Sequence, residues 1–139
     1  MADLPTSIHL TVVTQERKVL EADVEEVELP GSDGYLGVLP GHTPLLAMLK
    51  IGVLSYRQSG RDQAMAIKWG FAEVLPDRVI VLAQGATPAE EIDPAKAEAL
   101  RQEALRELAL LTSSDSSFAS VEAKLQESLA MLQVSSRGH

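Results

Sequence analysis

The stretch LPGSDGYLGVLPGHTPLL, residues 29–46, holds four glycines and three prolines and is the most distinctive part of the chain. Glycine permits positive φ, whereas proline fixes φ and removes a backbone donor, so a run of both follows a fixed path of tight turns. The sequence therefore predicts a surface loop over residues 30–44. This loop either shapes the edge of a β domain or presents a contact surface on a rigid scaffold.

The same stretch does not have the features of a phosphate-binding loop. It lacks the pattern G-x-x-x-x-G-K-[ST], and no helix begins directly after it. A nucleotide-phosphate cradle is therefore not expected in this segment.

Short apolar runs with strand character lie on both sides of the loop. They cover residues 8–14, 22–29, 53–57, 63–69, 71–75 and 79–83. Turn residues separate several of these runs, and such spacing is typical of an antiparallel β-sandwich or barrel. No helical segment lies between the runs, which argues against a parallel sheet. Trp69 and Phe71, in a chain with few aromatic residues, are expected to anchor the core.

After Thr87 the composition changes to that of helices. Asp93 is a good N-cap, and Pro94 follows at the first helical position. Two stripes of apolar residues at helical spacing flank a polar loop at residues 112–117, and residues 134–139 are expected to fray. The predicted fold class is α+β, with an antiparallel β-sandwich in residues 1–87 and an antiparallel helical hairpin in residues 88–139.

Composition limits the classes of partner. The 139 residues include 20 acidic and 12 basic side chains, for a net charge of −8, and no cysteine. Such an acidic chain is a poor nucleic-acid binder, because phosphate contacts need clustered Lys and Arg. The N-terminus resembles neither a signal nor a transit peptide, and no apolar run approaches the ~18 residues of a membrane span. A protein partner is expected, with any membrane contact made only indirectly.

No catalytic or metal-binding set can be assembled from the sequence. His9, His42 and His139 are far apart, and they show no metal-ligand spacing. His42 would need a nucleophile or an orienting carboxylate nearby to act as a general base. We therefore expect no catalytic residue and no metal, and interpret His42 as either a structural hydrogen-bonding residue or a partner contact.

The order of these motifs resembles the ε subunit of bacterial F-type ATP synthase. The family pattern Gly-x-x-Gly-x-Leu-Gly-hydrophobic-x-Pro-Gly-His-x-Pro-Leu-Leu stands here as residues 31–46. Residues 70–74 and 79–83 resemble family strands, and residues 92–97 are similar to the start of the first C-terminal helix. The resemblance covers nearly the whole chain, and the absence of a transit peptide favours a bacterial subunit.

The resemblance implies a non-catalytic rotor subunit of the central stalk, at the cytoplasmic face of the bacterial plasma membrane. Its partners would be the γ subunit and the c-ring, with the α and β subunits reached when the hairpin extends and blocks ATP hydrolysis. The c-ring-facing loop would contain Asp33, Gly34 and Tyr35. The γ-subunit contact would contain Pro40, Gly41, His42 and Thr43. Some relatives carry an acidic residue where Tyr35 stands, which leaves Asp33 as the charge in the loop.

In some members of the family the folded hairpin binds ATP through an Ile/Leu-Asp-x-x-Arg-Ala motif. Ile92, Asp93 and Ala97 match this motif, but Lys96 replaces the arginine. Lysine is a point charge and lacks the planar fork of the guanidinium. We expect no cofactor apart from weak ATP binding at Ile92, Asp93 and Lys96.

Three alternatives to the stalk subunit remain at this level. A nucleotide sensor would bind MgATP in calorimetry of the isolated chain. A carbohydrate-binding β-sandwich would need an exposed aromatic platform, which the sequence does not indicate. An enzyme is the weakest alternative, because no catalytic constellation is present.

Overall fold

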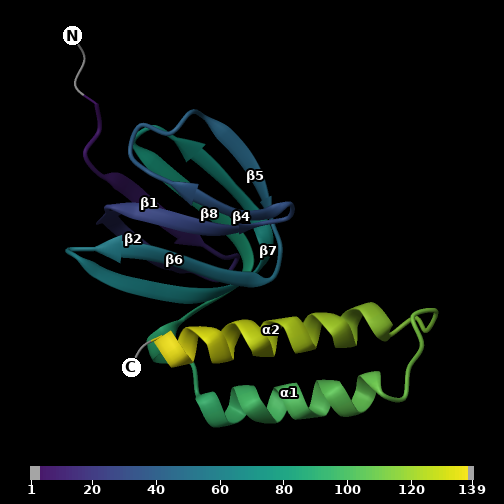
Figure 1. Ribbon diagram of the computed structural model, residues 1–139. Helices are drawn as coiled ribbons and strands as arrows, with labels where there is room; N and C mark the ends of the chain where they lie inside the picture. Colours follow the sequence, from purple (N-terminus) through teal and green to yellow (C-terminus); the bar gives the residue numbers. More distant parts are fainter. Residues whose placement is uncertain (1–3, 138–139) are drawn as a thin grey trace.

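The computed structural model describes residues 4–137 and confirms the predicted fold class, a β-sandwich followed by a helical hairpin (Figure 1). The strands in chain order are β1 (Ile8–Val13), β2 (Lys18–Val24), β3 (Glu26–Gly31), β4 (Gly34–Val38), β5 (Leu45–Leu49), β6 (Gly52–Gln58), β7 (Arg61–Leu75) and β8 (Arg78–Pro88). A short 3-10 helix, η1 (Ala89–Glu91), leads to α1 (Pro94–Leu108) and α2 (Phe118–Arg137).

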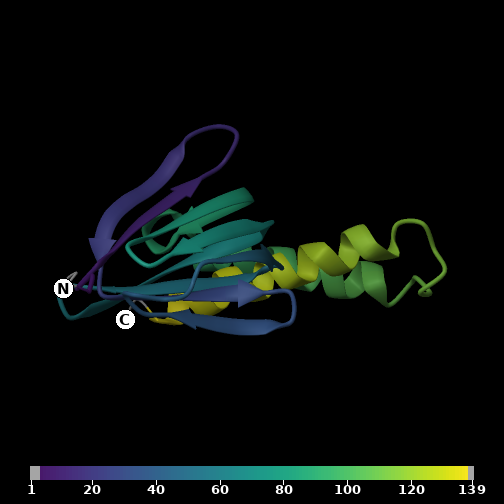
Figure 2. The ribbon, with the colours of Figure 1, turned by 90° about the horizontal axis from the view of Figure 1, so that it is seen from above.

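The long strand β7 links the two layers of the sandwich. It pairs with β6 along its first half and with β5 along its second half. The hydrogen-bonded order is β2-β1-β8-β7-β5-β3-β4, with β6 paired to β3 and β7. Figure 2 shows the layers from above, with the loop that joins the helices projecting beyond one end of the sandwich. Strand β8 ends at Pro88, next to the predicted domain boundary.

The strand pairings are antiparallel except for β1 and β8, which run parallel. These two strands come from opposite ends of the domain sequence, so no short hairpin dictates their relative direction. Local turn signals predict hairpins, and they carry no information about this long-range pairing.

The residues predicted as one surface loop, 30–44, are partly strand. Strand β3 continues through Gly31, and the chain then turns at Ser32 and Asp33 and returns as β4, which pairs with β3. Strand β5 follows directly after the loop and was not predicted either. The predicted strand over residues 22–29 is two strands, because the chain turns at Glu25, between β2 and β3.

Trp69 and Phe71 are not core residues, contrary to the prediction. Trp69 is 44% exposed and Phe71 is 39% exposed. The β7 side chains that enter the core of the sandwich are odd-numbered up to Ile67 and even-numbered from Ala72 onward. The change of facing occurs at Trp69 and Gly70, whose φ angles are 42° and 150°. Alternation along a strand assumes extended backbone, so these two positive φ angles turn the aromatic rings outward.

The hairpin begins as predicted. The Asp93 carboxylate accepts hydrogen bonds from the backbone N–H groups of Ala95 and Lys96, and Pro94 opens α1. The predicted loop at residues 112–117 joins the helices. The predicted fraying is wrong for residues 134–137, because α2 continues to Arg137 and Val134 is fully buried. Residues 138–139 lie outside the described part of the chain.

The hairpin rests on the sandwich through α2, which lies between α1 and the strands (Figure 1). Ala130 and Val134 of α2 pack with Val53 of β6 and Ala66 of β7 in a small cluster, separate from the main core of the sandwich. Among residues 4–137, no helix is long and apolar enough to cross a membrane.

Candidate functional site: two turns and an apolar face

The structure places Asp33, Gly34 and Tyr35 together at the β3–β4 turn. Asp33 and Gly34 are exposed, and Tyr35 is 49% exposed. Gly34 has φ of +133°, and a Cβ added at Gly31 would lie 2.6 Å from the carbonyl oxygen of Gly34. Both glycines are thus needed for this tight turn, one for its backbone angle and one for space.

Pro40, Gly41, His42 and Thr43 form the connection between β4 and β5. The backbone N–H of Gly41 donates to the carbonyl of Pro76 in the β7–β8 turn at 2.7 Å. His42 Nδ1–H donates to the carbonyl oxygen of Thr43 at 2.6 Å. This bond gives His42 a structural role within its own loop, one of the two alternatives drawn from the sequence.

The two predicted contact loops lie at opposite ends of β5. At its start, Leu45 pairs with Val74 next to the β7–β8 turn that holds Gly41. At its end, Leu49 pairs with Gly31 beside the β3–β4 turn. Five strand residues span about 16 Å at the usual rise per residue. The chain therefore offers two separate surfaces, which two different partners could contact at once.

An apolar stripe crosses the outer face between these two ends. Met48 of β5 pairs with Phe71 of β7, and Phe71 pairs with Leu82 of β8, so the three side chains stand in one row. They are 61%, 39% and 42% exposed, respectively. Within residues 4–137, the hairpin packs against β6 and the first half of β7 and leaves this stripe open. Contiguous exposed apolar residues of this kind mark protein interaction surfaces.

This stripe was not predicted from the sequence. Its signal was present in the alternation of β5, where Leu46 and Met48 stand on the face opposite Leu49. No strand was predicted over residues 45–49, and Phe71, the central side chain of the stripe, was predicted to lie in the core.

Ile92, Asp93 and Lys96 lie where the chain enters the hairpin. Ile92 packs against the small cluster under α2, Asp93 caps α1, and Lys96 is exposed. Arg101, on the same helix, donates two hydrogen bonds of 3.0 Å to Glu98. These bonds to Arg101, with one from Gln102, lower the pKa of Glu98 to about 2. The guanidinium of Arg101 is thus already committed to a carboxylate.

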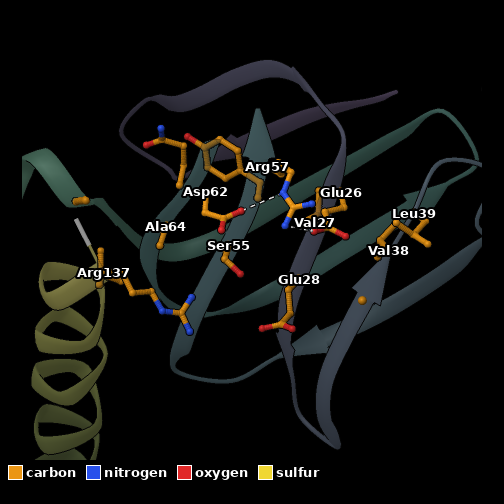
Figure 3. A pocket seen from close by; sticks show the side chains of 15 residues that line it. Glu26, Val27, Glu28, Val38, Leu39, Ser55, Arg57, Asp62, Ala64 and Arg137 are labelled. Carbon is orange, nitrogen blue, oxygen red and sulfur yellow. Dashed lines mark hydrogen bonds and ion pairs between the residues drawn. The ribbon is translucent and has the colours of Figure 1, made fainter. Parts of the chain in front are cut away.

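A groove of about 710 Å³ lies on the other face, between β3, β4 and β6 and the end of α2 (Figure 3). Arg57 lines the groove and pairs with Asp62 at 3.2 Å and with Glu26 at 3.4 Å. Arg137 reaches toward it from α2. Burial, with a smaller effect of the negative Glu90, raises the pKa of Tyr56 in the groove wall, so its phenol stays protonated. None of Ile92, Asp93 and Lys96 lines the groove.

Comparison with known proteins shows the family. Residues 7–89 match the family model described as ATP synthase, Delta/Epsilon chain, beta-sandwich domain. The chain is 41% identical over 131 residues to ATP synthase epsilon chain 2 of Syntrophotalea carbinolica, covering 94% of this chain and 95% of that protein. It is 45% identical over 130 residues to the ATP synthase epsilon chain of Syntrophobacter fumaroxidans, covering 94% and 96%.

Solved structures have the same fold. A chain of the Euglena gracilis mitochondrial ATP synthase, in a structure of OSCP, F1 and c-ring, superposes with a TM-score of 0.80 at 27% identity, covering 94% of this chain and 82% of that one. A chain of the Tetrahymena thermophila mitochondrial ATP synthase central stalk and c-ring gives a TM-score of 0.62 at 11% identity, which shows likeness of fold alone.

Proposed function

This chain belongs to the ATP synthase delta/epsilon family, and we propose that it is the non-catalytic ε-type rotor subunit in the central stalk of an F-type ATP synthase. In this role it couples rotation of the γ subunit to rotation of the c-ring. The complex would place it peripherally at the cytoplasmic face of a bacterial plasma membrane.

The observation that carries the proposal is the outward stripe of Met48, Phe71 and Leu82. A rotor subunit must be held firmly by its stalk partner, and burial of exposed apolar side chains is the main source of such affinity. Leu46, which is 65% exposed and lies on the same face of β5 as Met48, extends this apolar surface toward the loop of residues 40–43. We therefore assign both to the γ-facing surface, and the turn at Asp33, Gly34 and Tyr35 to the c-ring.

Copurification of γ with the full chain tests this assignment. Leu82→Asp places a charge in the stripe and should abolish or strongly weaken capture of γ. Leu105→Asp is the matched control, since Leu105 of α1 is 39% exposed and Leu82 is 42% exposed. Equal capture of γ by the wild type and both variants would show that the stripe is not part of the interface with γ.

We further propose that the hairpin restrains ATP hydrolysis by leaving the sandwich and reaching the α and β subunits. Its docking through a small cluster supports this proposal, because a small interface can open at a cost of a few kcal/mol. Deletion of residues 88–139 should then raise hydrolysis by the reconstituted complex. Unchanged hydrolysis would remove the inhibitory role.

The second candidate function is a nucleotide sensor at Ile92, Asp93 and Lys96. Asp93 already caps α1, and Arg101 already pairs with Glu98. With both side chains engaged, any ATP binding should be weak. Calorimetry of the isolated chain with MgATP discriminates between the two functions. A millimolar or absent response is expected, whereas micromolar affinity would favour the sensor.

A further inference from the structure

The backbone N–H of Val53 loses its strand partner where β3 leaves β6. The two strands pair from Glu26 with Arg57 to Glu28 with Ser55, after which β3 turns toward β5. The next carbonyl on β3, that of Pro30, accepts from the N–H of Lys50 at 2.9 Å. Val53 is 1% exposed, so solvent cannot readily satisfy its N–H.

The hydroxyl of Tyr35 takes the place of the missing strand. It accepts a hydrogen bond from the N–H of Val53 at 3.0 Å, reaching from β4 across β3 to the start of β6. Gly52 leaves the space that the hydroxyl needs, because a Cβ there would lie 2.9 Å from the tyrosine oxygen and 2.7 Å from Pro30 Cβ. The ammonium of Lys50 lies 5.7 Å from the centre of the Tyr35 ring.

Tyr35 thus contacts both turns at this end of the sandwich. The β3–β4 turn carries Asp33, and the β5–β6 turn carries Lys50, which is also exposed. Two backbone bonds hold the turns side by side, from Ser32 N–H to the carbonyl of Met48 and from Lys50 N–H to the carbonyl of Pro30. Tyr35 adds the only side chain that the structure shows bonded across them within residues 4–137.

We propose that Tyr35 is a positioning residue that joins the two turns into one composite docking surface, with Lys50 as a partner contact beside Asp33. This inference rests on the proposed docking of this end to the c-ring. The surface presents a cation and an anion from neighbouring turns. This surface fits a polar loop of the c-ring that offers a hydrogen-bond acceptor to Lys50 and a hydrogen-bond donor or a cation to Asp33.

The variant Tyr35→Phe tests the contribution of the hydroxyl separately from that of the aromatic ring. The variant keeps the aromatic face near Lys50 and removes only the acceptor for Val53. We expect the Val53 amide to exchange with solvent about three- to tenfold faster, the range that loss of one net hydrogen bond gives. The matched control is Tyr56→Phe, because the Tyr56 hydroxyl makes no hydrogen bond among the described residues.

Affinity for the ring tests the docking role. The full chain in complex with γ is titrated against detergent-solubilised c-ring from the same organism. Tyr35→Phe should weaken binding about three- to tenfold, and Tyr56→Phe should not change it. Lys50→Met should also weaken binding. In the Lys50→Met background, the loss caused by Tyr35→Phe should shrink, since the residue acts through the placement of Lys50.

Two results would overturn this inference and leave the proposed function intact. One is unchanged ring affinity or unchanged Val53 exchange in Tyr35→Phe, while the wild type binds the ring. The other is an undiminished loss in the Lys50→Met background, which would make Tyr35 independent of Lys50. Failure of the wild-type complex to bind the ring would overturn the proposed function as well, so the two failures are distinguishable.

Discussion

The ammonium of Lys68 on β7 lies 3.4 Å from the carboxylate of Glu127 on α2 and so ties the hairpin to the sandwich. A second ion pair, of Arg17 with Glu91 at 2.7 Å, ties the β1–β2 turn to η1 just before the hairpin. All four side chains are partly exposed, and each such pair contributes little to stability by itself. Docking of the hairpin therefore depends on several weak contacts, each of which can be tested.

Lys68→Met should shift the hairpin toward the undocked form by a factor of up to about five, the equivalent of ~1 kcal/mol. The ammonium of Lys68 also lies 5.4 Å from the centre of Trp69, the only tryptophan in the chain. Because the substitution itself removes this cation and would alter tryptophan fluorescence, the undocking is measured by hydrogen exchange of α2. Lys18→Met is the control, because Lys18 pairs with Glu21 inside β2. A similar undocking in the control would contradict the role of Lys68.

Val134→Ala should loosen α2 from the sandwich by about 2 kcal/mol, because it removes two buried methyl groups. Val134 belongs to the small cluster and not to the sandwich core, so the strands should keep their protection. Hydrogen exchange of α2 compared with β1 measures the effect. Leu110→Ala, at a residue that is 85% exposed, should change neither. Equal loss of protection in helix and strands would show that the two parts unfold together.

Gly70→Ala should destabilise the sandwich by about 3 kcal/mol or more. The added Cβ would lie 2.1 Å from the carbonyl oxygen of Leu82, and the φ of +150° disfavours any L side chain. Denaturant unfolding measures the loss. Gly37→Ala is the matched control, since a Cβ there meets nothing within 4 Å. A stability of Gly70→Ala equal to that of the control would show that β7 can relax at this point.

Asp93→Ala should lower the stability of the hairpin by about 1 kcal/mol, because the first-turn N–H groups of Ala95 and Lys96 lose their acceptor. Asp93→Asn retains an acceptor oxygen and should stay close to the wild type. Thermal unfolding of the helices, followed by circular dichroism, compares the two. If both variants lose the same stability, the carboxylate charge and not the cap is responsible.

His9 should make stability depend on pH. Hydrogen bonds to Asp23 at 2.8 Å and Glu21 at 3.1 Å raise the pKa of His9 above 6.5. This contribution is complete below the unfolded pKa and is lost as pH rises through the raised folded value. The bond to His9, with one to Lys18, lowers the pKa of Glu21, whose contribution is lost as pH falls through that value. Stability of the β1–β2 hairpin should therefore fall from pH 6 to pH 8.

Unfolding of His9→Gln across the same range checks this prediction. The variant should show a flatter pH profile between pH 6 and pH 8 than the wild type, because glutamine does not titrate. His42→Gln is the control, since the ring of His42 bonds to a backbone carbonyl and not to a carboxylate. An identical slope for His9→Gln and the wild type would assign the pH dependence to other groups.

Local chemistry made the hairpin and many strands predictable. Asp93 and Pro94 fix the start of α1 through a cap and a preset φ, and both act within one turn of the chain. The glycines and prolines of residues 30–44 indicated tight turns, but they did not separate the β3–β4 turn from the strands on either side of it. The hydrogen bond of Tyr35 could not be predicted either, since its partner lies 18 residues away on β6.

The wrong predictions at Phe71 and Val134 have different physical causes. Phe71 was assigned to the core by its aromatic character, but the backbone at Trp69 and Gly70 reverses the facing of the strand. Val134 was assigned to a frayed tail by its position near the end, but α2 buries it against Val53 and Ala66. The first error comes from unusual backbone angles within the strand, and the second from a contact between segments that are far apart in the sequence.

The small cluster beneath α2 has a consequence for how such genes can change. Its strand residues, Val53 and Ala66, have modest side chains, and the sandwich keeps its own larger core. A stop codon shortly after Pro88 would expose few apolar side chains of the sandwich to solvent. Selection could therefore remove or lengthen the helices without substitutions in the strands. The hairpin is in this sense a replaceable accessory, whereas Gly70 and Gly52 are positions that mutation can scarcely alter.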